Sequence, residues 1–301
     1  MPHQPPTERR NPASASIDRL DTLPLLELIN DQDAIVAGAV RAALPQLAAL
    51  VDAALAVLAG GGRIHYYGAG TSGRLALGDA VELGPTYGVG PDTVVAHLAG
   101  GPGAGGRARE DAEDHAPEEP PGAAPTAADL VIGITASGRT PYVAAALRAA
   151  RAAGAATALL SNDPAAPLAE LADLHVVLDT GPEVVTGSTR MKAGTAQKLA
   201  LNAFSTALMV RSGRTWSNLM ITASTHNAKL RERAVRTLAT ACEVPEPVAA
   251  EALAAADHET PTALVALVAG VGPAEARAAL AVAGGHPWSA VKSLTSRQVT
   301  P

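Results

Sequence analysis

The stretch that decides the fold is RIHYYGAGTSGRLALGDAVEL, residues 63–83. Residues 63–67 form a short apolar run next to glycines, which predicts a buried strand. GAGTSGR (68–74) then predicts a tight loop, and residues 75–83 predict a helix. A strand followed by a glycine-rich loop and a helix is typical of α/β folds.

The same order of elements recurs along the chain. Four more apolar runs predict strands, at residues 93–99, 129–135, 157–161 and 174–180. Helical patterns cover residues 34–59, 141–154, 188–212 and 218–240. Strands that alternate with helices indicate a doubly wound, five-stranded parallel sheet with helices on both faces.

Composition changes toward both ends of the chain. Residues 1–12 are polar and proline-rich and predict a flexible N-terminal arm. Residues 13–241 form the main domain, including the N-terminal helices. Residues 242–292 are alanine-rich with proline and glycine breaks, which predicts a small helical subdomain. The polar residues 293–301 are expected to form a loose tail.

The overall composition excludes several classes of protein. The net charge of −6 argues against a nucleic-acid binder, which needs a basic face. The 48% hydrophobic content excludes disorder over the whole chain. No apolar run reaches the roughly 18 residues that a membrane span needs, and the N-terminus has no secretory pattern. The single cysteine, Cys242, suits a reducing compartment. Taken together, these features predict a cytoplasmic protein with neither nucleic-acid nor membrane partners.

Two short loops resemble each other. GTSGR (70–74) and ASGRT (136–140) each follow a predicted strand and precede a helix. Ligands of such sheets bind beyond the carboxyl ends of the strands, and helix N-termini attract anions. One such loop is more simply read as a turn made of small residues. Two echoing loops favour a phosphate site, with hydroxyl donors from Thr71, Ser72, Ser137 and Thr140.

A third polar segment, TGSTRMKAGTAQK (186–198), opens the long helical pattern. Ser188 and Thr189 are expected to cap this helix, since hydroxyl side chains are favoured at helix N-termini. In one interpretation the segment is only a capped helix with solvated basic side chains. In the other, Ser188 contacts the same phosphate. The sequence does not separate these two interpretations.

Two carboxylates come from separate segments near the predicted loops. Glu82 ends the first loop–helix unit, and Glu113 lies in the acidic run REDAEDH. Such a pair can supply a general acid and a general base, although acidic residues are more often solvated surface groups. His65 and His97 lie in predicted strands and are expected as core or strand-end residues. No ligand spacing such as HExxH occurs, so we expect no metal.

The chain closely resembles the N-acetylmuramic acid 6-phosphate etherases of the sugar isomerase (SIS) domain superfamily. The resemblance covers about residues 7–233, through TERRNPASASIDRLDTLPLLELINDQD, GGGRIHYYGAGTSGRLALGDAVELGPTYGV, EDAED, ITASGRTPYV, EVVTGSTRMKAGTAQKL and NAKLRER. It implies a single SIS domain, a homodimer and no cofactor. The implied reaction cleaves the D-lactyl ether of N-acetylmuramic acid 6-phosphate with water. N-acetylglucosamine 6-phosphate and D-lactate result, a step in recycling cell-wall sugars.

Residue by residue, the resemblance assigns the two functional glutamates to Glu82, as the acid, and Glu113, as the base. The implied chemistry is an elimination followed by hydration. This chain departs from the family pattern at Gly84, usually proline, and at Asp111, usually glycine. The implied sugar-phosphate contacts fall on Gly70, Thr71, Ser72, Ser137, Gly138, Arg139, Thr140 and Ser188.

Two alternative functions share this architecture. An aldose–ketose isomerase of the same fold would also use a carboxylate at C2 of the sugar, and release of D-lactate would distinguish the etherase. A sugar-phosphate-sensing regulator would resemble the glucokinase regulatory protein, which carries two SIS domains. This chain has room for one.

Overall fold

The structure is a computed structural model that describes residues 3–107, 109–116, 124–222 and 228–297. The chain divides into two compact units, which are described separately. The first unit comprises residues 1–81 and 91–205, and the second comprises residues 82–90 and 206–301.

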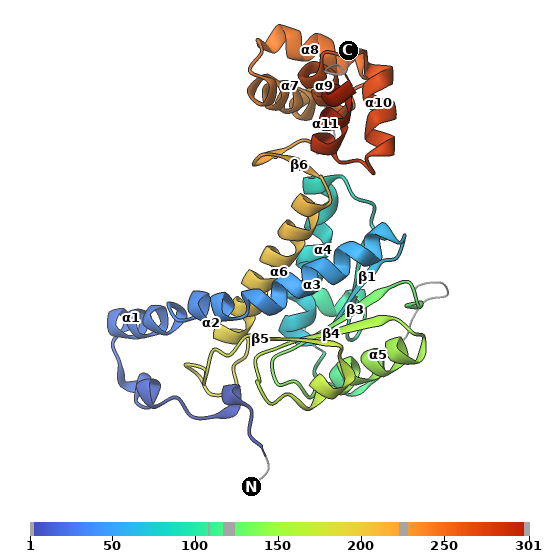
Figure 1. The fold of residues 1–301 in the computed structure, drawn as a ribbon. Coiled ribbons are helices and arrows are strands. Elements are labelled where there is room, and N and C mark those ends of the chain that lie inside the picture. Colours follow the sequence, from blue (N-terminus) through green and yellow to red (C-terminus); the bar gives the residue numbers. More distant parts are fainter. Residues whose placement is uncertain (1–2, 108, 117–123, 223–227, 298–301) are drawn as a thin grey trace. The chain divides into compact units, whose positions relative to one another are not determined.

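The first unit is built on a five-stranded parallel sheet in the order β2-β1-β3-β4-β5 (Figure 1). Each predicted strand is confirmed to within a few residues. Because the strands are parallel, all their carboxyl ends lie along one edge of the sheet. The strands are β1 (Ile64–Gly68), β2 (Val94–Leu98), β3 (Leu130–Thr135), β4 (Ala156–Ser161) and β5 (Leu174–Val177).

Helices cover both faces of this sheet, which confirms the doubly wound prediction. Successive side chains of a strand point to opposite faces, and β1 shows both. Tyr67 faces α5 (Pro141–Ala152), where its ring lies 6.1 Å from the ring of Tyr142. Tyr66 faces α6 (Lys192–Arg211), where its ring lies 6.4 Å from the ring of Phe204.

Before residue 212, the helical segments differ from the prediction at three places. The run 34–59 divides into α2 (Val36–Ala42) and α3 (Leu44–Ala59), because Pro45 restricts the residue before it and lacks an N–H donor. The helix expected over 75–83 is α4 (Gly70–Tyr87), which already begins inside the predicted loop. The long helix expected from residue 188 begins at Lys192.

The N-terminal segment packs against the rest of the first unit. It forms three short 3₁₀ turns, at Pro6–Glu8, Pro12–Ser14 and Ile17–Arg19, before α1 (Thr22–Asp33). The side chains of Thr7 and Asn11 are buried, and Ser14 Oγ donates to the carbonyl of Val184 at 2.7 Å. Residues 5–14, which include much of the predicted arm, are therefore anchored by burial and hydrogen bonds.

The second unit is largely helical. A short hairpin, β6 (Thr215–Trp216) and β7 (Leu219–Met220), stands where a helix was expected from residue 218. Ser217 in its turn has φ of 49°, a conformation that helices do not use. Five helices follow, and the last includes Ser293–Arg297 of the predicted tail. They are α7 (Ala228–Cys242), α8 (Glu246–Ala255), α9 (Thr260–Ala269), α10 (Pro273–Val282) and α11 (Pro287–Arg297).

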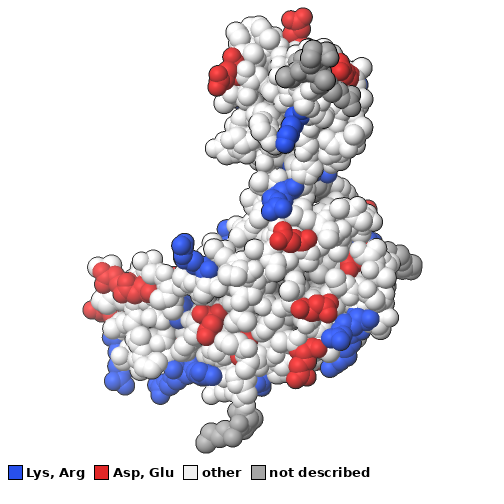
Figure 2. Space-filling model, in the orientation of Figure 1, with Lys and Arg blue, Asp and Glu red and all other residues white. Residues whose placement is uncertain are grey.

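The surface carries both signs of charge. On the face shown in Figure 2, basic and acidic side chains are interspersed and no basic stripe is present. Among the described helices, none is by itself long and apolar enough to cross a bilayer.

Candidate functional site

The loops after β1 and β3 lie side by side. These strands pair directly, with Gly68 opposite Ile134. The turn after β1 is very tight, since a Cβ atom placed on Gly73 would lie 2.4 Å from the carbonyl oxygen of Gly68. Gly70, with φ of 53°, starts α4 directly after this turn. Thr71 and Ser72 therefore belong to the first turn of α4, where backbone N–H groups have no partner within the helix.

The second loop holds its hydroxyl groups in a small network. Thr135 ends β3, and its Oγ1 lies 2.8 Å from Oγ1 of Thr140. Ser137 Oγ accepts a hydrogen bond from the backbone N–H of Arg139 at 3.3 Å. Thr140 precedes Pro141, the first residue of α5, and makes no capping bond with its side chain. The loop thus presents two half-buried hydroxyls next to a helix N-terminus.

Gly138 is required by the packing of this loop. Its φ is 66°, and a Cβ atom there would lie 2.2 Å from Cβ of Ala166. Its carbonyl accepts a hydrogen bond from the N–H of Leu168 at 3.2 Å. A side chain at this position would force the loop after β3 away from the loop after β4.

Ser188 and Thr189 do not cap α6, contrary to expectation. The helix begins at Lys192, and its first N–H groups are bound by the buried carboxylate of Glu183. Glu183 Oε2 accepts from the N–H of Lys192 at 3.0 Å, and Oε1 accepts from the N–H of Ala193 at 2.9 Å. A carboxylate bound by two N–H groups is a stronger cap than a hydroxyl, so the nearer hydroxyls are displaced.

The segment of Ser188 nevertheless lies beside the first loop. A Cβ atom on Gly194 would lie 3.1 Å from the carbonyl oxygen of Thr189 and 3.2 Å from Cγ2 of Thr71. The start of α6 therefore packs directly on the first turn of α4. The structure thus brings the loop at 187–191 next to Thr71, while the N-terminus of α6 itself is already occupied by Glu183.

A buried lysine extends this arrangement. The Lys192 side chain is 1% exposed, and its Nζ donates to Gln32 Oε1 at 3.0 Å. The same oxygen accepts from Nδ2 of Asn11 at 2.8 Å. Burial lowers the pKa of Lys192, and the neighbouring carboxylate of Glu183 opposes that shift. Sequence reasoning missed both Glu183 and Lys192, because the cap comes from a residue nine positions upstream.

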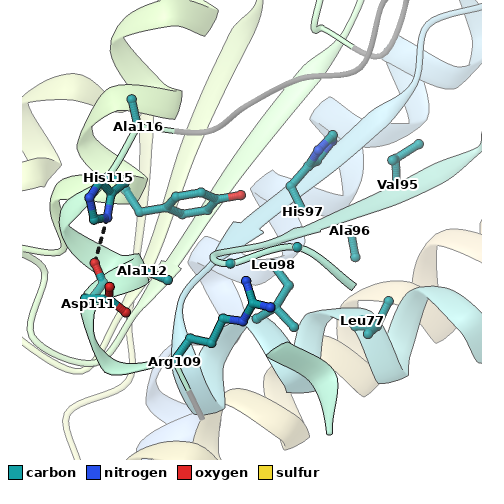
Figure 3. A pocket seen from close by; sticks show the side chains of 13 residues that line it. Leu77, Val95, Ala96, His97, Leu98, Arg109, Asp111, Ala112, His115 and Ala116 are labelled. Carbon is teal, nitrogen blue, oxygen red and sulfur yellow. Dashed lines mark hydrogen bonds between the residues drawn. The ribbon is translucent and has the colours of Figure 1, made fainter. Parts of the chain in front are cut away.

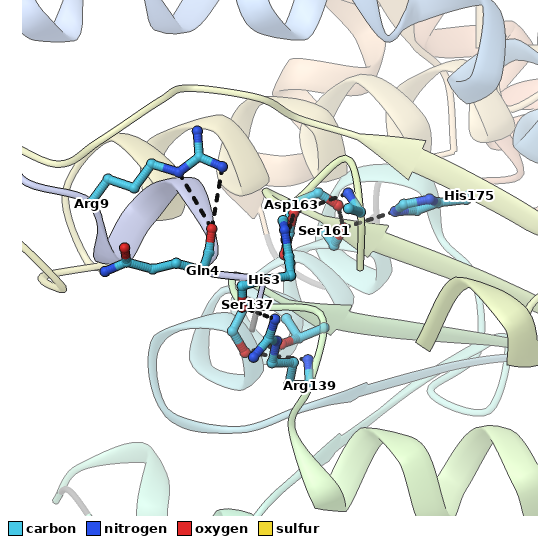
Figure 4. A network of polar contacts seen from close by, with 10 residues as sticks. His3, Gln4, Arg9, Ser137, Arg139, Ser161, Asp163 and His175 are labelled. Carbon is cyan, nitrogen blue, oxygen red and sulfur yellow. Dashed lines mark hydrogen bonds and ion pairs between the residues drawn. The ribbon is translucent and has the colours of Figure 1, made fainter. Parts of the chain in front are cut away.

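The N-terminus crosses the loops after β3 and β4 (Figure 4). Nε2 of His3 lies 2.8 Å from Oδ2 of Asp163, whose side chain is fully buried. Arg139 donates from its guanidinium to the carbonyl of His3 at 2.6 Å. Asp163 is tied in turn to Ser161, whose Oγ donates to its carbonyl at 3.1 Å. Arg139, which is predicted to contact the phosphate, therefore donates a hydrogen bond to the backbone carbonyl of His3.

The two predicted glutamates lie on different elements. Glu113 is exposed on the 3₁₀ segment η5 (Glu110–Asp114), which packs against α5. Glu82 is exposed in the second half of α4 and belongs to the second unit. Gly84 and Pro85 lie within the last turns of α4, so the helix continues past Glu82.

Metal ligands are not grouped in the described part of the chain. No cluster of three or more His, Cys, Asp or Glu side chains there could hold a metal ion. The groups near the loops include hydroxyls, backbone N–H groups, carboxylates and the guanidinium groups of Arg74 and Arg139. Such groups bind oxyanions and move protons.

Comparison with known proteins agrees with this arrangement. Residues 121–207 match the SIS domain family, and residues 46–151 match the N-terminal SIS domain of the glucokinase regulatory protein. An N-acetylmuramic acid 6-phosphate etherase of Thermobifida fusca is 56% identical over 264 residues, 87% of each chain. A protein of the same name from Edwardsiella ictaluri is 49% identical over 277 residues, which is 91% of this chain and 92% of that one.

The matched regions cover most of this chain in each case. A third relative of the same name, from Aeromonas hydrophila, is 48% identical and covers 93% of this chain and 95% of its own. The chain therefore belongs to the N-acetylmuramic acid 6-phosphate etherase family and contains a SIS domain.

Proposed function

We propose that this protein cleaves the D-lactyl ether of N-acetylmuramic acid 6-phosphate, giving N-acetylglucosamine 6-phosphate and D-lactate. The observation that carries this proposal is the 56% identity, over 87% of the chain, to a relative that bears the etherase name. The loops after β1 and β3 support it independently, because they offer the donors that a sugar phosphate needs.

The phosphate group is expected to bind between the starts of α4 and α5. Thr71 and Ser72 supply hydroxyls and N–H groups from the first turn of α4, and Ser137 and Thr140 supply hydroxyls beside the N-terminus of α5. The positive ends of both helix dipoles favour a dianion at this position. We expect Ser188 to contribute from the segment that packs on Thr71.

The ether bond is expected to break by elimination. In the open-chain aldehyde, the C1 carbonyl acidifies the proton on C2, and the carboxylate of Glu113 removes it. The C3–O bond then breaks, and the carboxylic acid of Glu82 gives its proton to the leaving lactate oxygen. Water adds its hydroxyl to C3 and its hydrogen to C2 of the unsaturated sugar. One water is consumed, and no redox step or metal is needed.

The roles of the two glutamates can be separated by exchange in D₂O. Glu113→Gln should abolish both lactate release and exchange of the C2 proton. Glu82→Gln should stop lactate release and still permit exchange, since exchange needs only the base and the acidified carbon. Loss of a general acid or base typically costs 10²–10⁴-fold in rate.

Asp114→Asn is the matched control for this experiment. Asp114 is exposed on the same 3₁₀ segment as Glu113, so its amide should leave lactate release within a few-fold of wild type. Exchange retained in Glu113→Gln and lost in Glu82→Gln would reverse the two roles. Near-full lactate release by both variants would show that the glutamates are ordinary surface residues. Turnover of the sugar phosphate without any lactate would identify an isomerase instead.

We further propose that the protein is a homodimer that acts in the cytoplasm, where phosphorylated sugars are found. Helix α1 supports the dimer, since none of its residues is buried in the first unit. Leu23 and Leu26 on this helix are 65% and 57% exposed, and Leu199 on α6 is 36% exposed. Light scattering at micromolar concentration should give about twice the chain mass of 30.2 kDa. A mass equal to one chain would contradict the dimer.

A further inference from the structure

The N-terminal segment joins several loops at the carboxyl edge of the sheet. Residues 3–9, here called the strap, contact the loop after β3, the loop after β4 and the segment before α6. All of these belong to the first unit. The loop after β3 and the segment before α6 carry Ser137, Thr140 and Ser188, three of the hydroxyls from which the phosphate site is proposed. The strap therefore connects two separate parts of that site.

His3 fastens one end of the strap. Its Nε2 lies 2.9 Å from Oδ1 and 2.8 Å from Oδ2 of Asp163, which follows β4 (Figure 4). The Asp163 side chain is fully buried, whereas that of His3 is 36% exposed. Carboxylate oxygens accept, so the imidazole of His3 donates through Nε2. A buried carboxylate is costly without donors, so opening the strap removes a donor that Asp163 needs.

Arg139 links the same end of the strap to the loop after β3. Its guanidinium donates to the carbonyl of His3 at 2.6 Å, and its backbone N–H donates to Ser137 Oγ at 3.3 Å. The position of His3 therefore bears on the backbone beside Ser137. Because the guanidinium is bound to the strap, Arg139 acts on the phosphate site by holding the loop in place.

The other end of the strap fastens the segment that carries Ser188. Thr7 is fully buried, and its carbonyl accepts a hydrogen bond from the N–H of Gly187 at 3.0 Å. Gly187 directly precedes Ser188 in the sequence. Between the two ends lie Pro5 and Pro6, which are both buried. Proline rings fix φ, so this part of the strap has little freedom to change its length.

These contacts do not involve the groups proposed to break the ether bond. The pocket beside β2 in Figure 3 is lined in part by Asp111, Ala112 and His115, which flank Glu113, and it belongs to the site already proposed. None of the residues that line it belongs to the strap. Loss of the strap should therefore change binding of the phosphate more than the chemical step.

We propose that the strap preorganises the phosphate site, with His3 as its latch and Arg139 as a positioning residue. This inference rests on the phosphate site proposed above. The strap holds the loop of Ser137 and the segment of Ser188 in register before the ligand arrives, and preorganised groups bind more tightly because less ordering remains to be done. By linkage, bound phosphate must stabilise the closed strap to the same extent.

The first test measures binding of inorganic phosphate to the full-length protein by calorimetry, at constant ionic strength. His3→Ala should raise the dissociation constant at least about threefold, since the latch is lost. His3→Gln should recover most of the affinity, because its amide Nε2 can still donate to Asp163. Gln4→Ala is the matched control. Gln4 is exposed, and its side chain donates to the carbonyl of Glu8 within the strap, at 2.9 Å. The affinity of this control should match that of wild type.

The second test separates binding from chemistry. In lactate release, His3→Ala should raise KM at least about threefold and leave kcat within about twofold, and His3→Gln should restore KM. A role of His3 in stability alone would lower the amount of folded enzyme, which reduces kcat and leaves KM unchanged.

The third test uses the reciprocal effect of phosphate on the strap. Arg9 and Arg10 are exposed, and Arg9 is held in the closed strap by donating to the carbonyl of Gln4 at 3.3 Å. Trypsin cleaves the opened segment, so the rate of cleavage after these arginines reports how often the strap opens. Saturating phosphate should slow this cleavage at least about threefold in wild type and much less in His3→Ala, whereas sodium chloride at the same ionic strength should not.

The outcomes distinguish the strap from the function on which it rests. Phosphate affinity in His3→Ala that stays within about threefold of wild type would overturn the strap alone, as would a fall in kcat with KM unchanged. Wild type that binds no phosphate would overturn the phosphate site and this inference with it. Absence of lactate release with phosphate still bound would overturn the etherase reaction, and calorimetry and proteolysis would still decide the role of His3.

Discussion

Replacing Asp79 by Asn should change how the stability of the first unit depends on pH. Asp79 lies on α4, where Ser205 Oγ donates to its Oδ1 at 2.9 Å and Tyr66 donates to its Oδ2 at 3.1 Å. Burial raises the pKa of this carboxyl from 3.8 to about 6, against the opposing effect of both hydrogen bonds.

The sign follows from proton binding in the two states. Between pH 4 and 6 the folded protein keeps a proton on Asp79 that the unfolded chain has released. The stability contributed by this proton is complete below pH 4 and is lost as the pH rises through 6. The change in the free energy of unfolding is about 3 kcal/mol.

His65 acts in the opposite direction over nearly the same range. Burial, aided by the charge of His97, lowers the pKa of His65 from 6.5 to about 4. Between pH 4 and 6.5 the unfolded chain takes up a proton that the folded protein excludes. Stability therefore rises with pH, again by about 3 kcal/mol. In the wild type the contributions of Asp79 and His65 to the pH dependence of stability should nearly cancel.

Urea unfolding at pH 4, 5, 6 and 7 tests this cancellation in wild type, Asp79→Asn, His65→Gln and the double variant. Far-UV circular dichroism follows both units, whereas fluorescence of Trp216 and Trp288 follows the second unit alone. Between pH 4 and 7, the free energy of unfolding of Asp79→Asn should rise by about 3 kcal/mol relative to that of wild type. That of His65→Gln should fall by about as much relative to wild type.

All other titrating groups are the same in the four proteins. Their effects therefore cancel when the free energy of unfolding of each variant is compared with that of wild type. The free energy of unfolding of the double variant should change with pH in the same way as that of wild type. A constant difference between Asp79→Asn and wild type, within about 1 kcal/mol across the range, would refute the assigned burial of Asp79. A flat difference for His65→Gln would refute the neutral, buried state of His65 in the same way.

Three further predictions follow from the site. Glu183→Ala leaves two N–H groups of α6 without their cap and should destabilise the first unit by about 3 kcal/mol in urea unfolding, whereas the exposed Glu170→Gln should change it by less than about 0.5 kcal/mol; equal effects would contradict the cap. Ser137→Ala should raise KM for the phosphorylated sugar with little change in kcat. Unphosphorylated N-acetylmuramic acid should have a kcat/KM at least about a hundredfold lower than the phosphorylated sugar. A hundredfold change corresponds to about 2.7 kcal/mol, which several charge-assisted hydrogen bonds to phosphate readily supply. Comparable kcat/KM for the two sugars would remove the phosphate site. Lactate release should survive prolonged EDTA treatment, and activity that is lost and then restored by a metal would reveal a missed metal site.

The sheet could be predicted because its strands leave a local signal. Each strand is a short apolar run followed by a small-residue turn, and the parallel order follows from the helices between them. This signal predicts all five strands. The family, too, could be predicted from motifs, and the identity of 46–56% to its relatives confirms it.

The polar interior could not be predicted, because its partners are far apart in the sequence. Glu183 caps a helix that begins nine residues later, whereas the local sequence favours Ser188 and Thr189 as caps. His3 meets Asp163 across 160 positions, so the polar N-terminus resembled a free arm. His65 and His97 are 32 residues apart, and only the register of β1 with β2 brings them together.

The buried carboxylate of Glu183 has a consequence for how binding responds to ionic strength. It binds the first N–H groups of α6 from within, so the proposed phosphate site relies mainly on the ends of α4 and α5 and on neutral hydroxyls. Few mobile counterions are then displaced when a phosphate arrives, and donors in partly buried loops are screened weakly by salt. Such a site retains its ligand at the ionic strength of the cell, about 0.15 M, where a cluster of surface lysines would lose much of its attraction.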